Sequence, residues 1–463
     1  MNPMRMTVFG TGYLGATHAA CMAELGHEVL GVDVDAAKIE ALAAGKVPFF
    51  EPGLPEILRR NIDNGRLSFT TDYDRAAEFA NVHFIGVGTP QRKGSYAADT
   101  TYVHAVIERL ASVVEGDHLI IGKSTVPVGT ATELQSRAEA LLGERGGVEN
   151  YGEADKPTPT MTVVWNPEFL REGHAVKDTL HPDRIVVGVP DYLAGSGEEP
   201  QSVGTIREIY ASALGEGTPF LVMDLPTAEL VKVSANAFLA TKISFINAVS
   251  EVCEAAGADV TALADAIGFD ERIGRKFLGA GLGFGGGCLP KDIRAFMARA
   301  GELGADQALT FLREVDAINM RRREKTVDMA KDALGGSLIG RNVTVLGAAF
   351  KPNSDDVRDS PALSVAGSLS LAGATVTVYD PEAMDNAAKL FPTLNYAVST
   401  DEALADAELV IVATEWKEFQ NLDPTRTKQL VAGTPKVLDG RNCLPRQEWI
   451  NAGWEFLALG LGA

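Results

Sequence analysis

Short apolar runs alternate with helical patterns in two separate stretches of the chain. The first stretch extends from residue 6 to about residue 190, and the second begins at residue 342. This alternation predicts parallel sheets covered by helices, because a helix has to connect each strand to the next. We read the polar, Gly- and Pro-rich segment 143–160 as a surface loop of the first stretch. The expected strands lie in MTVFG, EVLGVD, VHFIGVGTP, HLIIGKST, TVVWNP and RIVVGV, and then in NVTVLGAAFKP, ATVTVYDP, ELVIVATEW and KVLDGRN.

A helical segment separates the two α/β stretches. Residues 227–257 show helical periodicity over many turns, and more helix is expected to about residue 330, interrupted by a glycine-rich stretch. The predicted fold class is therefore α/β, with two Rossmann-like doubly wound domains joined by a long central helix and a helical middle domain. We expect a first α/β domain over 1–205, a central helical domain over 206–328, and a second α/β domain over 329–463.

Composition limits the partners that the chain can have. The formal net charge of −20 argues against nucleic acid or an anionic membrane as the main partner. No apolar run is long enough to cross a bilayer, and the strand pattern at the N-terminus leaves no room for a signal peptide. The four cysteines show no metal or redox spacing, so we expect reduced thiols and a cytoplasmic location.

The first expected strand leads into a G-x-G-x-x-G motif formed by Gly10, Gly12 and Gly15. Such a turn lets a pyrophosphate approach the N-terminus of the following helix. Asp33 ends the next strand at the distance where a carboxylate binds the ribose 2′-hydroxyl, which favours NAD over NADP. Lys38 could add a contact near the adenosine, although an exposed helix lysine is the simpler interpretation. The alternative for the glycines is a turn needed only for packing.

One cysteine stands in an unusual setting, the sequence GLGFGGGCLPKD. Pro290 suits the first position of a helix, so Cys288 would lie just ahead of a helix N-terminus, which favours the thiolate. Asp292 falls in the first turn. The alternative for Cys288 is a small buried thiol on a glycine-rich bend. Cys21 and Cys253 lie on apolar helix faces, and we interpret both as buried structural thiols. Cys443 has no identifiable partner.

Several long motifs carry a resemblance that covers nearly the whole chain. GFGGGCLPKD, FGTGYLG, GVGTP, KSTVPVGT, NPEFLREG and LVKVSANAFLATKISFINAVSE resemble the UDP-glucose/GDP-mannose dehydrogenase family. Members of this family oxidise the primary alcohol of a sugar nucleotide twice, with two NAD⁺ and one cysteine thiol. The resemblance implies an aldehyde captured by the thiolate as a thiohemiacetal, then a thioester that water hydrolyses to the acid. It implies no metal.

The resemblance assigns catalytic roles to six residues. Glu168 and Glu172 are four residues apart and would share a face if their segment is helical, and partial burial there could raise a carboxylate pKa; a solvated acidic helix face is the alternative. Lys232 and Asn236 project together from an apolar run, where a lysine could steady an alkoxide; a solvent-seeking lysine is the alternative. The catalytic set that the resemblance implies is Cys288, Lys232, Asp292, Asn236, Glu168 and Thr125, the last to position a water.

The resemblance implies that 1–205 binds NAD, that 206–328 contains the catalytic cysteine and that 329–463 binds the UDP-sugar. It also implies cofactor and substrate contacts. For the cofactor they are Gly10, Gly12, Tyr13, Leu14, Gly15, Asp33, Lys38, Thr89, Thr125, Glu172, Lys291 and Arg358. For the substrate they are Glu168, Phe169, Leu170, Arg171, Glu172, Lys232, Asn236, Arg272, Phe277, Leu278, Gly279, Ala280, Gly281, Gly285 and Lys351. Arg272 would reach a substrate held by a neighbouring subunit, and Arg441 is a weaker candidate for the diphosphate. Surface arginine is the alternative for each of these cations.

Three functions stay open from the sequence. The leading expectation is oxidation of UDP-glucose to UDP-glucuronate, and its nearest competitor is the same chemistry on GDP-mannose or a UDP-N-acetylhexosamine. The third is a non-catalytic nucleotide-binding regulator. In such a protein some catalytic residues should be replaced, but the set is complete here. A two-electron hydroxy-acid dehydrogenase would need no thiol. A homodimer or higher homo-oligomer is expected from the resemblance alone.

Overall fold

The computed structural model describes residues 3–149, 158–190 and 199–462, which divide into two compact units. The first unit is Met1–Ala235 and the second is Asn236–Ala463. The long helix α11 (Leu225–Ala256) contains the point of division. The three-domain division expected from the sequence stays a prediction.

The first unit contains an eight-stranded sheet in the order β3-β2-β1-β4-β5-β6-β7-β8. The first six positions follow the strand order typical of dinucleotide-binding domains. The strands pair in parallel, except that β7 runs antiparallel to β6. The strands are β1 (Arg5–Phe9), β2 (Glu28–Val32), β3 (Leu67–Thr70), β4 (Val82–Ile85), β5 (Asp117–Gly122), β6 (Thr160–Trp165), β7 (Ile185–Val189) and β8 (Phe220–Asp224).

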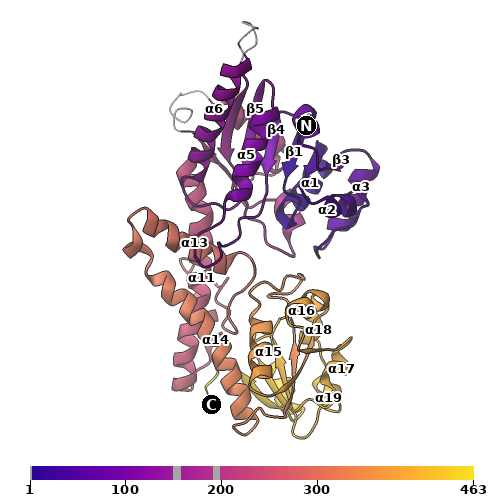
Figure 1. Ribbon diagram of the computed structural model, residues 1–463. Helices are drawn as coiled ribbons and strands as arrows, with labels where there is room; N and C mark the ends of the chain where they lie inside the picture. Colours follow the sequence, from indigo (N-terminus) through magenta and orange to yellow (C-terminus); the bar gives the residue numbers. More distant parts are fainter. Residues whose placement is uncertain (1–2, 150–157, 191–198, 463) are drawn as a thin grey trace. The chain divides into compact units, whose positions relative to one another are not determined.

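Helices cover this sheet, and α5 and α6 lie side by side along it (Figure 1). The helices of the unit that precede α11 are α1 (Tyr13–Glu24), α2 (Ala36–Ala43), α3 (Leu54–Asp63), α4 (Tyr73–Phe79), α5 (Thr101–Val113), α6 (Thr130–Glu149), α7 (Ala175–Leu180), α9 (Gln201–Ile209) and α10 (Ala211–Gly215).

The strands of the first unit are apolar on both faces. Ile120 and Ile121 are adjacent in β5 but belong to two different hydrophobic clusters, and Val163 and Val164 of β6 do the same. Successive side chains of a strand point to opposite faces, so both faces of the sheet are packed against helices. This explains why the strands read as continuous apolar runs.

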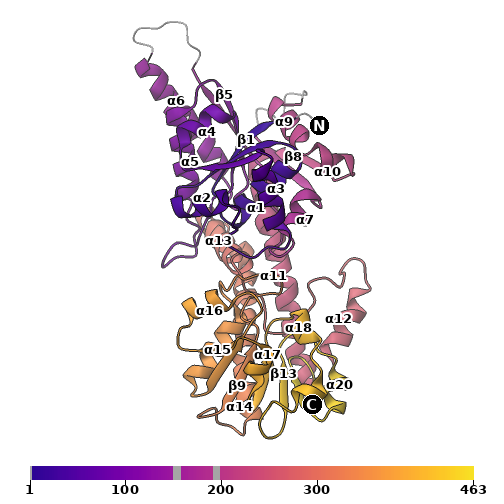
Figure 2. The ribbon, with the colours of Figure 1, turned by 90° about the vertical axis from the view of Figure 1, so that its right-hand side faces the viewer.

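The second unit contains a six-stranded parallel sheet in the order β11-β10-β9-β12-β13-β14, which repeats the order of β1 to β6. Figure 2 shows its helices beside β9 and β13. Its elements are β9 (Asn342–Leu346), α15 (Pro361–Leu371), β10 (Thr375–Tyr379), α16 (Met384–Leu390), β11 (Asn395–Tyr396), α17 (Thr400–Leu404), β12 (Leu409–Val412), α18 (Lys417–Gln420), α19 (Pro424–Thr427), β13 (Lys436–Asp439), α20 (Arg446–Asn451) and β14 (Glu455–Ala458).

The helical segment before this sheet matches the expected pattern. After α11 come α12 (Val260–Gly268), α13 (Leu289–Glu302), a 3₁₀ turn η1 (Asp306–Leu309) and α14 (Phe311–Ala333). The long middle helix, the second α/β sheet and the fold class are therefore confirmed.

Two sequence expectations were wrong in detail. Residues 143–149 of the expected loop 143–160 belong to α6, which runs to Glu149, because the helix continues through its glycines. Residues 150–157 of that loop lie outside the described part of the chain. The run that contains β7 was expected in a parallel sheet, but β7 opposes β6, which an apolar run alone does not reveal.

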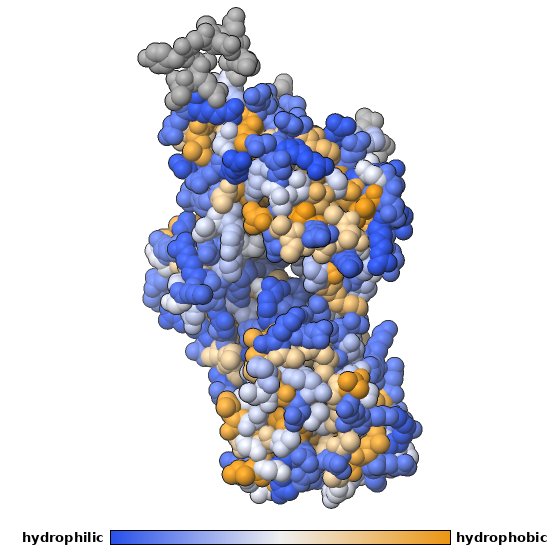
Figure 3. Space-filling view, turned by 45° about the vertical axis from the view of Figure 1, so that its right-hand side comes forward, coloured by the Kyte–Doolittle hydropathy of each residue, from blue (hydrophilic) through white to orange (hydrophobic). Residues whose placement is uncertain are grey.

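Hydrophilic side chains cover most of the face seen in Figure 3, with apolar residues in small groups. Among the residues that the structure describes, no helix combines the length and the apolarity that crossing a bilayer requires.

The start of α6 is held by a buried carboxylate from α11. Glu229, which is 2% exposed, accepts hydrogen bonds from the N–H groups of Gly129 (2.6 Å) and Ala131 (2.7 Å). These groups lie at a helix N-terminus, where backbone N–H groups have no intrahelical acceptor and a negative charge is stabilising.

Replacing Glu229 by Gln removes that charge and one of the two acceptor oxygens. We expect Glu229→Gln to lower the free energy of unfolding by about 1–3 kcal/mol. The control is Glu133→Gln in the first turn of α6, whose side chain is 70% exposed; its effect should stay below about 0.5 kcal/mol. Equal effects in urea unfolding would contradict this account.

Candidate active site

The glycine motif after β1 has two crowded positions, Gly10 and Gly15, and one open position, Gly12. A Cβ on Gly15 would lie 1.7 Å from the carbonyl oxygen of Gly10, whereas a Cβ on Gly12 would meet no atom within 4 Å. Gly10 has φ +84°, which favours glycine. Gly15 is therefore required by packing, and Gly12 leaves open space ahead of the α1 N-terminus. That space fits a pyrophosphate.

Asp33 lies beside this loop and keeps capacity for a ligand. Its Oδ2 accepts from Thr11 N (2.8 Å), Thr11 Oγ1 (3.1 Å) and Lys38 Nζ (2.9 Å), and its Oδ1 accepts from Asp35 N (3.1 Å). Burial acts to raise the pKa of Asp33, but the ammonium of Lys38 and the backbone N–H groups hold it below its ordinary value. The second lone pair of Oδ1 can accept from a ribose hydroxyl.

Tyr13 joins the glycine motif to the segment that contains Glu172. Its hydroxyl donates to Glu51, and it accepts from the N–H of Gly173 at 2.9 Å. Glu172 is 8% exposed and directly precedes Gly173, whose N–H donates to Tyr13. The structure thus brings two predicted cofactor contacts together, and Leu14 follows on the first turn of α1.

Thr89 and Thr125 also meet. The Oγ1 of Thr89, 7% exposed, donates to the carbonyl of Thr125 at 2.6 Å. Thr89 follows β4 and Thr125 follows β5, and these are adjacent parallel strands. The carboxyl ends of parallel strands lie at one edge of a sheet, where ligands bind in such folds.

Glu168 and Glu172 do not share a helix face. Residues 166–174 form an irregular segment between β6 and α7, so the helical expectation was wrong. Pro167 and Gly173 lie in this segment, and Glu168 Oε1 accepts from the N–H groups of Phe169 (2.8 Å) and Leu170 (3.0 Å) instead.

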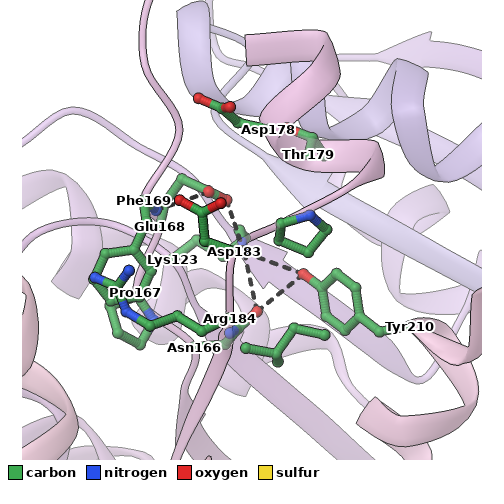
Figure 4. Close-up of a pocket in the computed structure, with 12 residues that line it drawn as sticks. Lys123, Asn166, Pro167, Glu168, Phe169, Asp178, Thr179, Asp183, Arg184 and Tyr210 are labelled. Carbon is green, nitrogen blue, oxygen red and sulfur yellow. Dashed lines mark hydrogen bonds and ion pairs between the residues drawn. The ribbon is translucent and has the colours of Figure 1, made fainter. Parts of the chain in front are cut away.

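The other charges of this segment are paired. Glu168 Oε2 lies 2.9 Å from Lys123 Nζ, and Arg171 binds Asp178 through Nε (2.8 Å) and Nη2 (2.6 Å). The Glu168–Lys123 ion pair lies in a pocket at the ends of β5 and β6 (Figure 4). Lys232, which is half-buried on α11, places its Nζ 5.4 Å from the centre of the Phe169 ring.

Cys288 is an exposed residue at the start of α13 in the second unit. The helix begins at Leu289, so Pro290 holds its second position rather than the expected first. Asp292 is 2% exposed; its Oδ2 accepts from Asn236 Nδ2 at 2.7 Å, and its Oδ1 lies 2.8 Å from Lys291 Nζ. The Asn236 amide and a buried carboxylate thus sit one turn beyond the thiol.

The glycines before Cys288 are explained by close packing within the second unit. A Cβ on Gly285 would lie 2.3 Å from the Asp359 carbonyl oxygen, and one on Gly287 would lie 2.4 Å from the Arg358 guanidinium. A Cβ on Gly283 would lie 2.2 Å from Asn319 Oδ1. The sequence suggested close approach at this run, and the approaching groups belong to the chain itself.

Most predicted cations have carboxylate partners. Arg358 binds Asp356 through Nε (2.9 and 3.0 Å) and Nη2 (2.7 Å), and Arg272 binds Asp270 through Nη2 at 2.6 Å. Lys351 Nζ lies 5.1 Å from the centre of the Phe350 ring.

Arg441 has a structural role that its sequence context did not reveal. It donates to the carbonyls of Gly283 and Ala413, both at 2.8 Å, and so holds the glycine run in place.

The predicted substrate stretch 277–281 has an irregular backbone that begins in a turn at Phe277. Phe277 has φ +64° and is 40% exposed, whereas Leu278 and Ala280 are buried. Gly279 lies between them, and the N–H of Gly281 donates to Asn247 Oδ1 at 2.9 Å. Within the described ranges, no group of three or more His, Cys, Asp or Glu side chains is arranged to hold a metal ion.

The second sheet has an aspartate at the position equivalent to Asp33. Asp380 ends β10 and accepts from the N–H groups of Ala348 (2.7 Å) and Ala349 (3.0 Å) and from Trp416 Nε1 (3.0 Å). It also accepts from the backbone of residues 382 and 383. Five donors saturate a carboxylate, so Asp380 has no capacity for a ribose.

The first unit has a dinucleotide loop with an acidic acceptor for a ribose hydroxyl. The second unit exposes a thiol at a helix N-terminus. Together these features define an NAD-dependent dehydrogenase. Residues 4–214 match the UDP-glucose/GDP-mannose dehydrogenase family, NAD binding domain. Residues 226–321 match the central domain of that family, and 344–446 match its UDP binding domain. The chain belongs to the UDP-glucose/GDP-mannose dehydrogenase family, as its motifs predicted.

Named relatives and a solved structure extend over the whole chain. It is 41% identical over 457 residues to a UDP-glucose 6-dehydrogenase of Rhizobium meliloti, with 99% of both chains covered. It is 38% identical to UDP-glucose 6-dehydrogenase YwqF of Bacillus subtilis over 99% of this chain and 98% of the relative. A UDP-glucose dehydrogenase structure from Pyrobaculum islandicum superposes with a TM-score of 0.87 at 37% identity, covering 100% and 98% of the two chains.

The two glycines offer a matched test of the dinucleotide loop. Gly12→Ala should keep the melting temperature, since φ is −69° and the methyl group enters open space, but should weaken NAD⁺ binding about tenfold. Gly15→Ala should lose about 1–3 kcal/mol of stability through overpacking. Calorimetric NAD⁺ titration and thermal unfolding separate the two effects. Unchanged NAD⁺ affinity in Gly12→Ala would place the cofactor elsewhere.

Proposed function

We propose that this chain oxidises UDP-glucose to UDP-glucuronate with two NAD⁺ and a covalent intermediate on Cys288. The observation that carries the proposal is the exposed Cys288 at the α13 N-terminus, one turn from the buried Asn236–Asp292 pair. The full-length similarity to UDP-glucose 6-dehydrogenases supports the substrate. We include in the proposal the three domains 1–205, 206–328 and 329–463, a cytoplasmic location, and a homo-oligomer.

The proposed chemistry balances as two hydride removals and one hydrolysis. NAD⁺, when bound, accepts the hydride. The first oxidation removes a hydride from C6 and a proton from its hydroxyl, which gives the aldehyde. The Cys288 thiolate then forms a C–S bond to C6, and the resulting alkoxide takes a proton to give a thiohemiacetal. A second loss of hydride and proton gives the thioester. Water attacks C6, the C–S bond breaks, and the thiolate leaves.

The remaining residues have roles that follow from their contacts. The helix N-terminus at Cys288 favours the thiolate. Asn236, fixed by Asp292, and Lys232 can each donate a hydrogen bond to an alkoxide, which stabilises the charge that develops on the sugar oxygen. Thr125 would hold the hydrolytic water, and Glu168 would accept a hydrogen bond from it.

Stoichiometry tests the thiol mechanism. We expect two NADH per sugar acid for the wild type, and no sugar acid from Cys288→Ala, because the aldehyde then has no covalent acceptor. Cys253→Ala is the control, since Cys253 is 3% exposed within a hydrophobic cluster of the second unit and should keep the wild-type ratio. One NADH per product, or normal turnover by Cys288→Ala, would contradict the mechanism.

A substrate panel tests the sugar nucleotide. We expect kcat/KM for UDP-glucose to exceed that for GDP-mannose and UDP-N-acetylglucosamine by at least about 100-fold, because a site built to hydrogen-bond one base and one sugar leaves polar groups unpaired when either is changed. NADH formation at 340 nm measures each rate. Turnover of GDP-mannose without turnover of UDP-glucose would remove this substrate assignment while keeping the chemistry.

A further inference from the structure

A lysine that the sequence analysis did not single out lies at the centre of the pocket in Figure 4. Lys123 directly follows β5, and its side chain is 4% exposed. Its Nζ lies 2.9 Å from Glu168 Oε2, 3.0 Å from Asn166 Oδ1 and 3.1 Å from the Tyr210 hydroxyl. An ammonium group has three N–H donors, so each donor has an acceptor.

Glu168 is held from two sides. Oε1 accepts two backbone N–H groups, those of Phe169 and Leu170, and Oε2 accepts from Lys123. A carboxylate offers about four acceptor positions. These contacts leave one lone pair of Oε2 for a water molecule or a substrate hydroxyl, with its direction fixed by the other three bonds.

The cluster depends on the charge of Lys123. Burial acts to lower the pKa of Lys123, but Glu168 and Tyr210 outweigh it and raise that pKa above its usual range. Burial raises the pKa of Tyr210, which stays a neutral donor to Asn166 Oδ1 at 3.0 Å. His18 is fully buried nearby, and burial lowers its pKa well below the usual value, so it adds no second positive charge.

Lys123 also belongs to the segment that carries Thr125. Ser124 Oγ donates to the Val87 carbonyl at 2.7 Å, and the Thr125 carbonyl accepts from Thr89 at 2.6 Å. The backbone between Lys123 and Thr125 is therefore fixed on the neighbouring strand end. Through this segment, Lys123 connects the carboxylate of Glu168 to Thr125.

We propose that Lys123 is a positioning residue for thioester hydrolysis, acting through Glu168. Together with two backbone N–H groups, its ammonium fixes the Glu168 carboxylate so that one lone pair of Oε2 is left for the attacking water. The water then forms its bond to C6 as the C–S bond breaks, the Cys288 sulfur leaves as thiolate, and the proton passes to Glu168 and on to solvent. This inference rests on the proposed function, and hydride transfer does not depend on it.

The test is a double-mutant cycle with Lys123→Met, Glu168→Gln and the double variant. For Lys123→Met we expect the NADH burst to stay near two per site while the steady-state rate falls about 10- to 100-fold, since small misplacements of catalytic groups have effects of this size. Mass spectrometry of quenched enzyme should find the sugar acyl group on Cys288. The double variant should match Glu168→Gln within about twofold, because coupled residues are non-additive.

Two further variants separate positioning from loss of stability. Tyr210→Phe removes one of the three acceptors but keeps the ion pair, so its steady-state rate should fall between those of wild type and Lys123→Met. Leu110→Ala, in the α5 core, lowers stability elsewhere in the unit and should keep the wild-type burst and rate per folded molecule.

The outcomes distinguish the inference from the proposed function. A wild type without a two-NADH burst would overturn the function itself. If the wild type shows the two-NADH burst but Lys123→Met, folded and able to bind NAD⁺, does not, Lys123 acts in hydride transfer. That result would overturn the inference. If Lys123→Met does not fold, the test is made with the double variant, in which both charges are removed. A steady-state rate of the double variant more than tenfold below that of Glu168→Gln would also overturn the inference.

Discussion

The structure depends on two sheets with the same strand order, and the first is buried on both faces. In the first unit this order places the ends of β1, β2, β4, β5 and β6 at one edge. Gly10, Asp33, Thr89, Lys123 and Glu168 each follow one of these strands. The hydrophobic packing of the strands thus determines where the polar groups of the loops come together, although the packed side chains contact no ligand.

The polar groups at that edge are organised by charge as well as by topology. Each important carboxylate, Asp33, Glu168 and Glu229, is met by backbone N–H groups, and the first two also by a lysine. In a chain with a net charge of −20, such local partners keep buried anions stable. When most lone pairs of a carboxylate already accept hydrogen bonds, the remaining lone pair points in a defined direction. A defined direction lets the carboxylate position a reacting group.

Sequence patterns predicted the elements well and long-range contacts poorly. Apolar runs located the main strands, and periodicity located α11, because both signals are local. Lys123 lies within the run HLIIGKST, where a strand was expected, and it was not singled out because its partners Asn166 and Tyr210 are 43 and 87 residues away. The glycines near Cys288 suggested close approach, but Asp359 and Arg358, which approach them, could not be identified from spacing. Glu168 accepts from the backbone N–H groups of Phe169 and Leu170, which helical spacing did not anticipate.

The contrast between Asp33 and Asp380 bears on how two oxidations can share one protein. Asp380 is closed off by Trp416 and four backbone donors, whereas Asp33 retains a vacant acceptor position. Under the proposed scheme, spent and fresh cofactor must therefore exchange in succession at the first unit. The half-oxidised sugar has to stay bound while the cofactors exchange. A covalent bond to the enzyme is therefore needed because of this waiting time, and not because of either hydride transfer.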